Sequence, residues 1–540
     1  MISDLFKKAM KVFWILPGFL LWAVFPPMGE KLDVVFALAP LMWLSRRADA
    51  KTSAKRWFLS GLFFWTATLS WMPSIVKNGG PWPLVVLGWA VLALYCAAYF
   101  AAYGYLSAKS WRWARSGGYW RRLAMIFFVE PVLWCALELV RGRLGGGFAW
   151  NQLGAVAVNG GFGAPAALGG VYLLSALVIL INGTIAGIVQ RAWNRDVQGP
   201  RWAHPLETFL PFLLAWTVFC RSEKFLPGEG EISREPVRVA LVQRNFPCVF
   251  KAQEDDPYAV YERLLGNIKA LNPDLVVLPE SAMCEFGPVD GLRAVSFSKW
   301  LASSVGASLL AGGSRSDETG LFNSAALYQK DRPLQVYDKV HLVPFGEFIP
   351  GDKWIKALQK FAPVGSCTPG NLRLLELQRE SGEPVRLGVA ICFEDTDSAQ
   401  MRKLAEMGAQ MLVFITNDSW FSNSVEAEQH AWQARARAVE TGLPVVRVGN
   451  SGVSGTLSPD GAAAWLVGAD GRVLVDERGT MFDRVFPADS KTPYVRFGDK
   501  PLVFAALVIF AVWIVRFALR RRKGRLIRYV EENGFEKNVS

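Results

Sequence analysis

The chain has 540 residues, of which 51% are hydrophobic and only 20% are charged, and its mean hydropathy is +0.21. So apolar a composition excludes a disordered chain and a nucleic-acid-packaging protein, although the formal net charge is +12. The apolar residues are concentrated before residue 221 and again at 501–519, while the stretch between them has the composition of a water-soluble domain. These features predict a membrane protein that carries one soluble domain.

Eight apolar segments approach the length of about 20 residues that a membrane-spanning helix requires. Seven of them precede the soluble stretch and one follows it: 12–27, 34–44, 57–76, 83–106, 123–140, 166–189, 206–220 and 501–519. The second and the seventh are short. The first has a basic flank but no small-residue cleavage site after it, so we expect a retained helix rather than a signal peptide.

Basic residues alternate between the loops that join these segments. Lysine and arginine cluster before the first segment and at 46–56, 109–122, 191–201 and 520–523, while the intervening loops carry few. Because cytoplasmic loops collect such residues, both termini are predicted to be cytoplasmic and the soluble domain to lie on the far side of the membrane. The expected domains are 1–221, 222–498 and 499–540.

Two carboxylates, Glu130 and Glu138, fall inside the fifth apolar segment, where a charge is costly unless it faces a partner or a cavity. Glu138 lies one helical turn from Arg141, so a structural pair is at least as good an interpretation as a functional role. The glycine- and aromatic-rich segment 145–151 is too polar to span a membrane and too apolar for a free loop. We expect it at the outer interface, facing lipid.

From Pro236 onward, short β-branched runs alternate with stretches of helical spacing, which is typical of an α/β layered domain. The predicted strands are 237–243, 274–278, 308–312, 324–329, 386–392, 411–416 and 444–449, and the predicted helices are 258–270, 398–407 and 426–441. Catalytic groups in such sheets collect beyond the carboxyl ends of strands. That rule directs attention to Glu280 after one buried strand, Cys392 at the end of another, and Lys339 inside an apolar, proline-punctuated stretch.

Each of these three residues has an ordinary explanation when taken alone, as a capping glutamate, a surface lysine or an inert small cysteine. Together they supply the parts of an acyl-transfer reaction. A cysteine attacks as its thiolate, so a nearby base must accept its proton, and a partly buried glutamate can do so at neutral pH. A lysine ammonium beside the reacting carbon would stabilise the oxyanion of the tetrahedral intermediate.

These motifs resemble those of the nitrilase, or carbon–nitrogen hydrolase, superfamily over most of residues 236–490, including 414–421 and 435–447. The resemblance implies a four-layer αββα sandwich in which Glu280 is the general base, Lys339 the oxyanion-stabilising cation and Cys392 the nucleophile. Glu347 matches a second glutamate that supports the site. Further candidates for substrate-binding or supporting roles are Phe393, Glu394, Asn417, Trp420 and Phe421.

A nitrilase-like domain on an eight-helix frame resembles the apolipoprotein N-acyltransferase family of the bacterial envelope. The most specific supports are 340–347, 417–421 and 492–499, the last of which leads into the final apolar segment. Where that family often has tyrosine after the nucleophile, this chain has Phe393. The resemblance implies a multi-pass protein of the bacterial inner membrane with its catalytic domain in the periplasm. It also implies a phospholipid acyl donor and a diacylglyceryl lipoprotein as acceptor.

The chemistry implied is ping-pong. Cys392 would take an acyl chain from a phospholipid, for which the resemblance implies phosphatidylethanolamine and its sn-1 chain, and pass it from the thioester to the α-amine of the acceptor's N-terminal cysteine. The conversion of an ester to a thioester and then to an amide lowers the free energy overall, so no cofactor is expected. The three separated histidines, His204, His341 and His430, do not predict a metal site. Each buried methylene contributes about 0.8 kcal/mol, so the site must lie at the membrane interface. We expect exposed apolar loops around 345–350 and 420–421 to act as lids.

Other interpretations remain open from the sequence. A membrane-anchored amidase that hydrolyses a small amide would share the three residues but predicts a water-filled pocket closed to the bilayer, and the scarcity of charges in the spans disfavours a transporter. Trp420 and Phe421 are equally compatible with core packing, and Asn417 with shaping its own loop. Cys248, Cys284 and Cys367 are candidates for a disulfide in an oxidising compartment, although their spacing does not decide the pairing.

Overall fold

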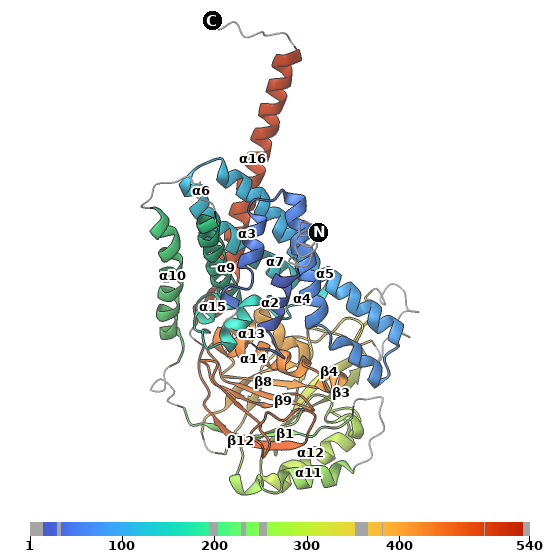
Figure 1. Ribbon diagram of the computed structural model, residues 1–540. Coiled ribbons are helices and arrows are strands. Elements are labelled where there is room, and N and C mark those ends of the chain that lie inside the picture. Colours follow the sequence, from blue (N-terminus) through green and yellow to red (C-terminus); the bar gives the residue numbers. More distant parts are fainter. Residues whose placement is uncertain are drawn as a thin grey trace, which may run out of the picture.

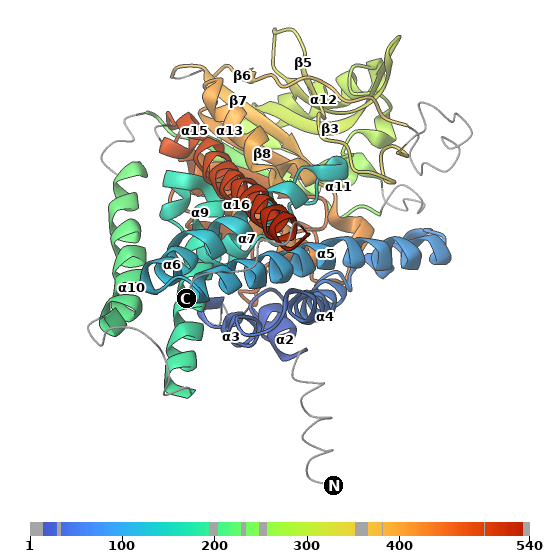
Figure 2. The same ribbon diagram turned by 90° about the horizontal axis from the view of Figure 1, so that it is seen from above.

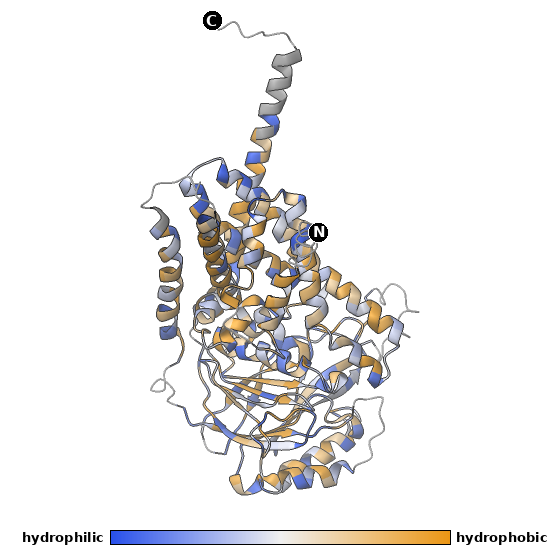
Figure 3. Cartoon of the chain, viewed as in Figure 1, coloured by the Kyte–Doolittle hydropathy of each residue, from blue (hydrophilic) through white to orange (hydrophobic). Residues whose placement is uncertain are grey.

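The computed structural model describes residues 15–29, 34–193, 203–227, 234–247, 256–350, 366–380, 382–490 and 492–532. Long helices gather at one end of the molecule and two β-sheets at the other (Figure 1). The last helix, α16 (Lys500–Glu532), begins beside the sheets and runs through the helical end and beyond it. Hydrophobic residues line the long helices along most of their length (Figure 3).

Among the described residues, five helical segments are long and apolar enough to cross a membrane: Ala50–Asn78, Trp82–Arg115, Tyr119–Arg141, Pro165–Ala192 and Lys500–Leu519. Each overlaps one of the eight apolar segments expected from the sequence. The other three contain α2 (Leu16–Ala23), α3 (Ala39–Ser45) and α10 (Ala203–Ser222). Of these, α2 and α3 are far shorter than the 20 residues that a span requires.

Local sequence explains where the long helices begin and which faces they expose. Asp49 caps α4 (Ala50–Thr68) by accepting hydrogen bonds from the backbone N–H groups of Lys51 and Thr52, at 3.0 and 3.1 Å. The first half of α5 (Trp82–Arg115) exposes large apolar side chains, as Trp82 and Leu87 are 66% and 59% exposed. Such a surface suits lipid rather than water.

A buried ion pair holds the helical end together. Glu130, at the start of α7 (Glu130–Arg141), contacts Arg46 at 2.8 Å. The other oxygen of the same carboxylate accepts hydrogen bonds from Ser107 at 3.1 Å and from the indole of Trp111 at 2.7 Å. Every oxygen of Glu130 therefore has a partner, and the residue is explained by structure alone.

The sheets have six strands each. The first has the order β12-β1-β2-β3-β4-β5 and the second β11-β10-β9-β8-β7-β6. The strands are β1 (Val237–Gln243), β2 (Leu275–Val277), β3 (Ser308–Asp317), β4 (Gly320–Tyr328), β5 (Gln335–Asp338), β6 (Leu375–Leu377), β7 (Val385–Ile391), β8 (Met411–Thr416), β9 (Val445–Gly449), β10 (Gly455–Leu457), β11 (Ala463–Trp465) and β12 (Gly479–Val485). In both sheets three central parallel strands are flanked by antiparallel ones.

Three large hydrophobic cores pack the described part of this domain. The first joins the facing sides of the two sheets, with Val239 and Leu241 of β1 packed in one cluster with Val389 and Ile391 of β7. The alternate residues of β1 pack with the helices α11 (Pro257–Leu265) and α12 (Leu292–Val305). The second sheet packs in the same manner with α13 (Ser398–Glu406) and α14 (Glu426–Thr441). Period-two alternation in a strand produces this division between its two faces.

Several predicted elements are confirmed with their bounds, namely β1, β8 and α14. The strands β5, β6, β10, β11 and β12 and the helix α12 were not predicted. The remaining helices of the membrane end are α6 (Tyr119–Ala124), α8 (Leu153–Asn159) and α9 (Pro165–Trp193), and α15 (Pro493–Phe497) precedes α16. Figure 2 shows α16 lying alongside α7, with which it is in contact.

Gln429 of α14 connects the two ends of the molecule. Its amide oxygen accepts hydrogen bonds from the indole N–H groups of Trp71, at 3.2 Å, and Trp150, at 2.9 Å. Its amide nitrogen donates to the carbonyl oxygens of Pro26, at 3.2 Å, and Thr68, at 3.3 Å. One fully buried side chain of the sheet domain thus satisfies polar groups from several segments of the helical domain, so the two domains pack as one body at this point.

We predict that Gln429→Leu destabilises the full-length protein by at least ~2 kcal/mol, because two indole N–H groups and two carbonyl oxygens would lose buried partners. The midpoint of thermal unfolding in detergent measures the effect. Glu428→Ala, at the exposed neighbouring position of α14, is the matched control and is expected to shift the midpoint little. Equal midpoints for Gln429→Leu and the unmodified protein would contradict this view of the junction.

Candidate active site

The three residues singled out in the sequence converge although they lie far apart along the chain. Glu280 follows β2, Lys339 follows β5 directly, and Cys392 follows β7 directly. The ammonium nitrogen of Lys339 lies 4.0 Å from Oε1 of Glu280, and both side chains are buried. Gly312 on β3 permits this close packing, because a Cβ there would lie 2.7 Å from the Cα of Glu280.

Cys392 lies on a sharp turn in the field of the two charged residues. Its φ of 54° is in the left-handed region, which costs a non-glycine residue about 1 kcal/mol and is common at functional sites. Burial raises the pKa of its thiol well above the ordinary value, and the Glu280 carboxylate raises it further while Lys339 lowers it. The resting thiol therefore keeps its proton. Glu280 is the neighbour that would accept this proton, and Lys339 is the neighbour that would balance the charge of the thiolate.

The charge of Glu280 is set by opposing neighbours. Burial raises its pKa most, and the Glu347 carboxylate adds to that rise, while Lys339 and a hydrogen bond from Asn323 oppose it. The net direction is upward. A carboxylate with a raised pKa holds a proton more strongly and is a better general base near neutral pH.

Glu347 and Asn323 hold Lys339 in place. Oε1 of Glu347 accepts a hydrogen bond from Lys339 at 2.9 Å, and Oε2 accepts one from the backbone N–H of Val343 at 2.8 Å. The amide nitrogen of Asn323 donates to both Glu280 and Glu347, at 2.7 Å each. Burial alone would lower the pKa of Lys339, but Glu347, Cys392 and Glu280 outweigh it and raise that pKa, so the lysine is positively charged. Asn323 carried no recognisable signal in the sequence.

Glu394 is occupied by structural hydrogen bonds. This fully buried carboxylate accepts from the hydroxyl of Tyr337 at 2.9 Å, from the N–H groups of Val340 and His341 at 2.8 and 3.0 Å, and from that of Ile391 at 2.8 Å. It thereby ties the end of β7, which bears the cysteine, to the segment that bears the lysine. Its geometry is that of a positioning residue.

An aromatic wall beside Cys392 comes from the helical domain. Phe393 stacks on Phe148, with ring centroids 6.1 Å apart, and on Trp150, at 6.4 Å, and the ring of His341 meets its edge at 5.6 Å. The expectation that segment 145–151 faces lipid is therefore wrong for its second half: Trp150 and Asn151 are buried against the sheet domain.

Glu138 of the fifth apolar segment and Arg141, just after that segment, explain this placement. Oε1 of Glu138 accepts a hydrogen bond from the N–H of Leu153 at 2.9 Å. Arg141 donates to the carbonyl oxygens of Phe148 and Trp150, at 2.7 and 2.9 Å. Both side chains thus fix the backbone that carries the aromatic wall. The sequence left open a structural pair or a functional role for Glu138, and this contact is structural but supports the candidate site.

The other supporting candidates divide into loop-shaping and packing residues. Oδ1 of Asn417 accepts from Ser419 at 2.6 Å and from Asn450 at 3.0 Å, which is the loop-shaping alternative. Phe421 meets the edge of Trp71 at 4.7 Å, and the carbonyl oxygen of Trp420 accepts a hydrogen bond from Asn78. These two residues pack at the domain junction. Phe345 is different, since it is 66% exposed, as expected for an apolar loop at this site.

The cysteine pairing that the sequence left open is answered for two of the three candidates. Cys284 and Cys367 are both free thiols. Cys248 lies outside the described residues. A disulfide between Cys284 and Cys367 is therefore absent.

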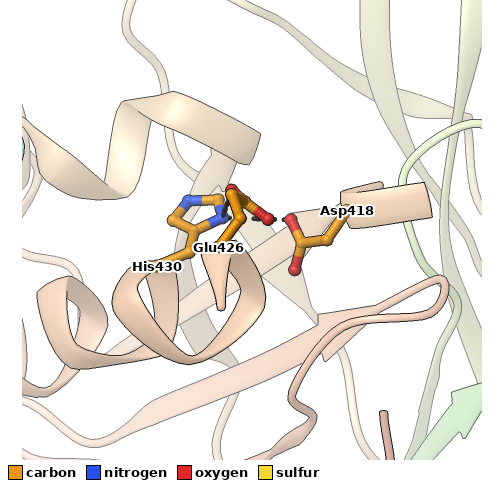
Figure 4. A group of neighbouring side chains, drawn as sticks. All are labelled: Asp418, Glu426 and His430. Carbon is orange, nitrogen blue, oxygen red and sulfur yellow. Dashed lines mark hydrogen bonds and ion pairs between the residues drawn. The ribbon is translucent and has the colours of Figure 1, made fainter. Parts of the chain in front are cut away.

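A buried charged cluster lies beyond the end of β8. Figure 4 shows the side chains of Asp418, Glu426 and His430 turned toward one another, each offering an atom within 4.8 Å of the others, as metal ligands do. The ring of His430 contacts Asp418 through Nδ1 at 3.0 Å and Asp395 through Nε2 at 2.9 Å. Arg447 donates to the same two aspartates. Because both ring nitrogens face carboxylates, the imidazolium, in which both are donors, fits this geometry. Two cations then balance the two aspartates.

The pKa of His430 has a consequence for stability. Burial lowers this pKa, but Asp395 and Asp418 outweigh burial and the repulsion of Arg447 and raise it from 6.5 to about 10. A raised histidine pKa stabilises the fold fully below pH 6.5, and the contribution is lost as pH rises toward 10. Glu426 behaves differently, because burial and then Asp418 raise its pKa so that it keeps its proton.

We predict that His430→Gln destabilises the protein by about 3 kcal/mol or more at pH 6, since it removes one of the two cations that balance two buried aspartates. The difference in unfolding midpoint between His430→Gln and the unmodified protein should become smaller as pH rises from 6.5 to 10. Glu426→Gln, which mimics a protonated carboxyl group, should have a much smaller effect at pH 6. A gap that widens with pH would contradict the assigned imidazolium.

Comparisons with known proteins cover both domains. The family model for the apolipoprotein N-acyltransferase N-terminal domain matches residues 17–184, and the carbon-nitrogen hydrolase model matches 238–480. A solved structure, the NitN amidase from Neterenkonia sp. AN1, is 17% identical, covers 49% of this chain and 98% of its own, and has a TM-score of 0.36.

Full-length relatives are more informative. The apolipoprotein N-acyltransferase of Pasteurella multocida is 27% identical over 545 residues, which cover 97% of this chain and 99% of the relative. That of Geobacter metallireducens is 30% identical over 525 residues, which cover 94% of this chain and 95% of the relative. The chain belongs to the apolipoprotein N-acyltransferase family.

Proposed function

We propose that this protein transfers an acyl chain from a membrane phospholipid to the α-amine of the N-terminal diacylglyceryl-cysteine of lipoproteins, through a thioester on Cys392. The observation that carries the proposal is the meeting of Glu280, Lys339 and Cys392 beside an aromatic wall supplied by the helical domain. The names of the full-length relatives agree with it.

In the first half-reaction, Glu280 accepts the proton of the Cys392 thiol, and the thiolate attacks the carbonyl carbon of an ester of the phospholipid. The ammonium of Lys339, held by Glu347, stabilises the oxyanion that forms. The carbon–oxygen bond to the glycerol then breaks, the leaving oxygen takes the proton from Glu280, and lysophospholipid departs. An acyl thioester remains on Cys392.

In the second half-reaction, the α-amine of the acceptor attacks the thioester carbon, and Glu280 accepts the proton that the amine loses. Collapse of the tetrahedral intermediate breaks the carbon–sulfur bond, and the proton returns to the sulfur. The acceptor becomes an amide and the enzyme regains its thiol. Glu347 and Asn323 act as positioning residues throughout, because they contact the lysine and the glutamate rather than the reacting atoms.

The topology that we propose has eight spans, domains 1–221, 222–498 and 499–540, an αββα sandwich as the catalytic domain, and both termini in the cytoplasm of the bacterial cell. Two observations support the orientation. Asn78, after α4, contacts Ser419 and Trp420 of the catalytic domain, whereas the basic cluster around Arg46 precedes the same helix at its other end. The helix α16 likewise starts beside the sheets and ends far from them.

We predict that incubation with phospholipid in the absence of acceptor increases the intact mass by one acyl group, and that a diacylglyceryl lipopeptide removes the increment. Cys392→Ala should show no increment, and Glu280→Gln should acquire it roughly 10²- to 10⁴-fold more slowly. Cys284→Ala, which removes another free thiol of the same domain, is the control and should acylate normally. Full lipopeptide acylation by Cys392→Ala would contradict the mechanism.

A second prediction tests whether the wall contacts hydrocarbon. Phe148→Ala should slow thioester formation about 10-fold for 16-carbon donors, because contacts with several methylenes are lost, each contributing up to about 0.8 kcal/mol. Donors with four-carbon chains should be slowed less than twofold. Phe162→Ala, which removes an exposed aromatic ring of the helical domain, serves as the control. Equal slowing for both chain lengths would favour an enzyme for small amides.

A further inference from the structure

A groove separate from the candidate active site lies where the helical domain meets the sheet domain. Its walls are Arg143, just after the end of α7, one face of α13, and the segment from the end of α15 into the start of α16, and its volume is about 370 Å³. Beside the groove, His341 contacts Phe393 of the aromatic wall on one side and Asp397, the N-cap of the lining helix α13, on the other. Neither Cys392 nor Phe393 lines the groove.

One end of the groove is positively charged. Three basic side chains line it, Arg143, Arg402 and Lys500, against a single lining acid, Asp499. Arg143 pairs with Asp499 but remains half exposed, and Lys500 is exposed. Arg402 is tied to structure, since it donates to the carbonyl oxygen of Val495 at 3.1 Å and pairs with Glu406 at 3.2 Å. Among the described residues that line the groove, Lys500 is thus the cation with no ion pair to an acid, and the half-exposed guanidinium of Arg143 can be reached from solvent beside its partner Asp499.

The other end of the groove is apolar and continues into the membrane-spanning part of α16. Phe504 and Leu507 are 71% and 59% exposed, and the candidate span Lys500–Leu519 buries none of its most apolar stretch in the protein. At 1.5 Å per residue, Leu507 lies about 10 Å along the helix from Lys500. The groove thus has a cationic end and an apolar end. The distance between these ends is similar to the distance from the headgroup of a phospholipid to the first methylenes of its chains.

We propose that this groove binds one anionic glycerophospholipid from the leaflet that faces the catalytic domain. Its phosphodiester would lie against Lys500 and Arg143, and its chains would lie along Phe504 and Leu507. Two of the three lining cations are paired with acids, Arg143 with Asp499 and Arg402 with Glu406, so Lys500 leaves one positive charge in excess, which favours an anionic headgroup over a zwitterionic one. The groove differs from a lipid-exposed helix with snorkelling side chains in that three separate elements form its walls. Because Cys392 does not line the groove, this lipid would be distinct from the acyl donor of the proposed reaction.

Native mass spectrometry of the full-length Cys392→Ala protein tests the proposal, because this variant forms no thioester and every retained lipid is non-covalent. The protein is released from nanodiscs that contain equal amounts of phosphatidylglycerol and phosphatidylcholine. We expect one phosphatidylglycerol to be retained at least 5-fold over phosphatidylcholine. Adding Arg143→Gln and Lys500→Gln should abolish this preference, whereas Lys299→Gln with Lys403→Gln, which removes the same charge from exposed positions outside the groove, should preserve it.

Two outcomes would overturn the proposal. One is retention of both lipids in proportion to their amounts in the nanodisc, which indicates adventitious lipid only. The other is an unchanged preference in the Arg143→Gln, Lys500→Gln protein. Circular dichroism and the unfolding midpoint establish that the variant is folded, and Phe504→Ala, which should lower retention without changing net charge, supplies an independent measurement. Neither outcome depends on whether Cys392 carries acyl groups.

Discussion

The structure depends on keeping one ammonium group buried and charged. Lys339 lies in the interior between two carboxylates, and a buried charge is tolerated only when such partners and hydrogen bonds surround it. Glu347 is the near partner, at 2.9 Å, and Glu280 the more distant one, at 4.0 Å. This asymmetry leaves Glu280 able to exchange a proton while Glu347 holds the lysine. The same positive charge is what a thiolate or an oxyanion on the Cys392 side requires.

The proposed reaction adds a second constraint, because the reacting carbon of the lipid must be reached without moving hydrocarbon through water. Removing a 16-carbon chain from a membrane would cost on the order of 10 kcal/mol at about 0.8 kcal/mol per methylene. The fold answers this constraint by bringing a loop of the helical domain to the nucleophile, where Phe148 and Trp150 stack on Phe393. Glu138 and Arg141 hold that loop by hydrogen bonds to its backbone, and Gln429 of α14 accepts a hydrogen bond from the indole of Trp150. Glu138 and Arg141 therefore fix the hydrophobic wall of the proposed active site.

The sequence predicted the central strands well because their hydrophobic character is continuous. β1, β8 and α14 have the expected bounds, and Glu280 and Cys392 follow buried strands as parallel-sheet rules require. The edge strand β12 was missed because it is half exposed and contains Asp483 and Arg484, so it has no continuous apolar run. Segment 145–151 was misplaced for a different reason. Its position depends on hydrogen bonds from side chains that precede it and on rings from the other domain, and no local pattern encodes those contacts.

The most direct test of the account is an experimental structure of the protein with an acyl group on Cys392. The account predicts that the thioester carbonyl oxygen lies within hydrogen-bond distance of Nζ of Lys339, and that the chain passes along Phe393 and Phe148 toward the helical domain. A carbonyl oxygen directed away from Lys339, or a chain that leaves through the sheet domain into solvent, would contradict it.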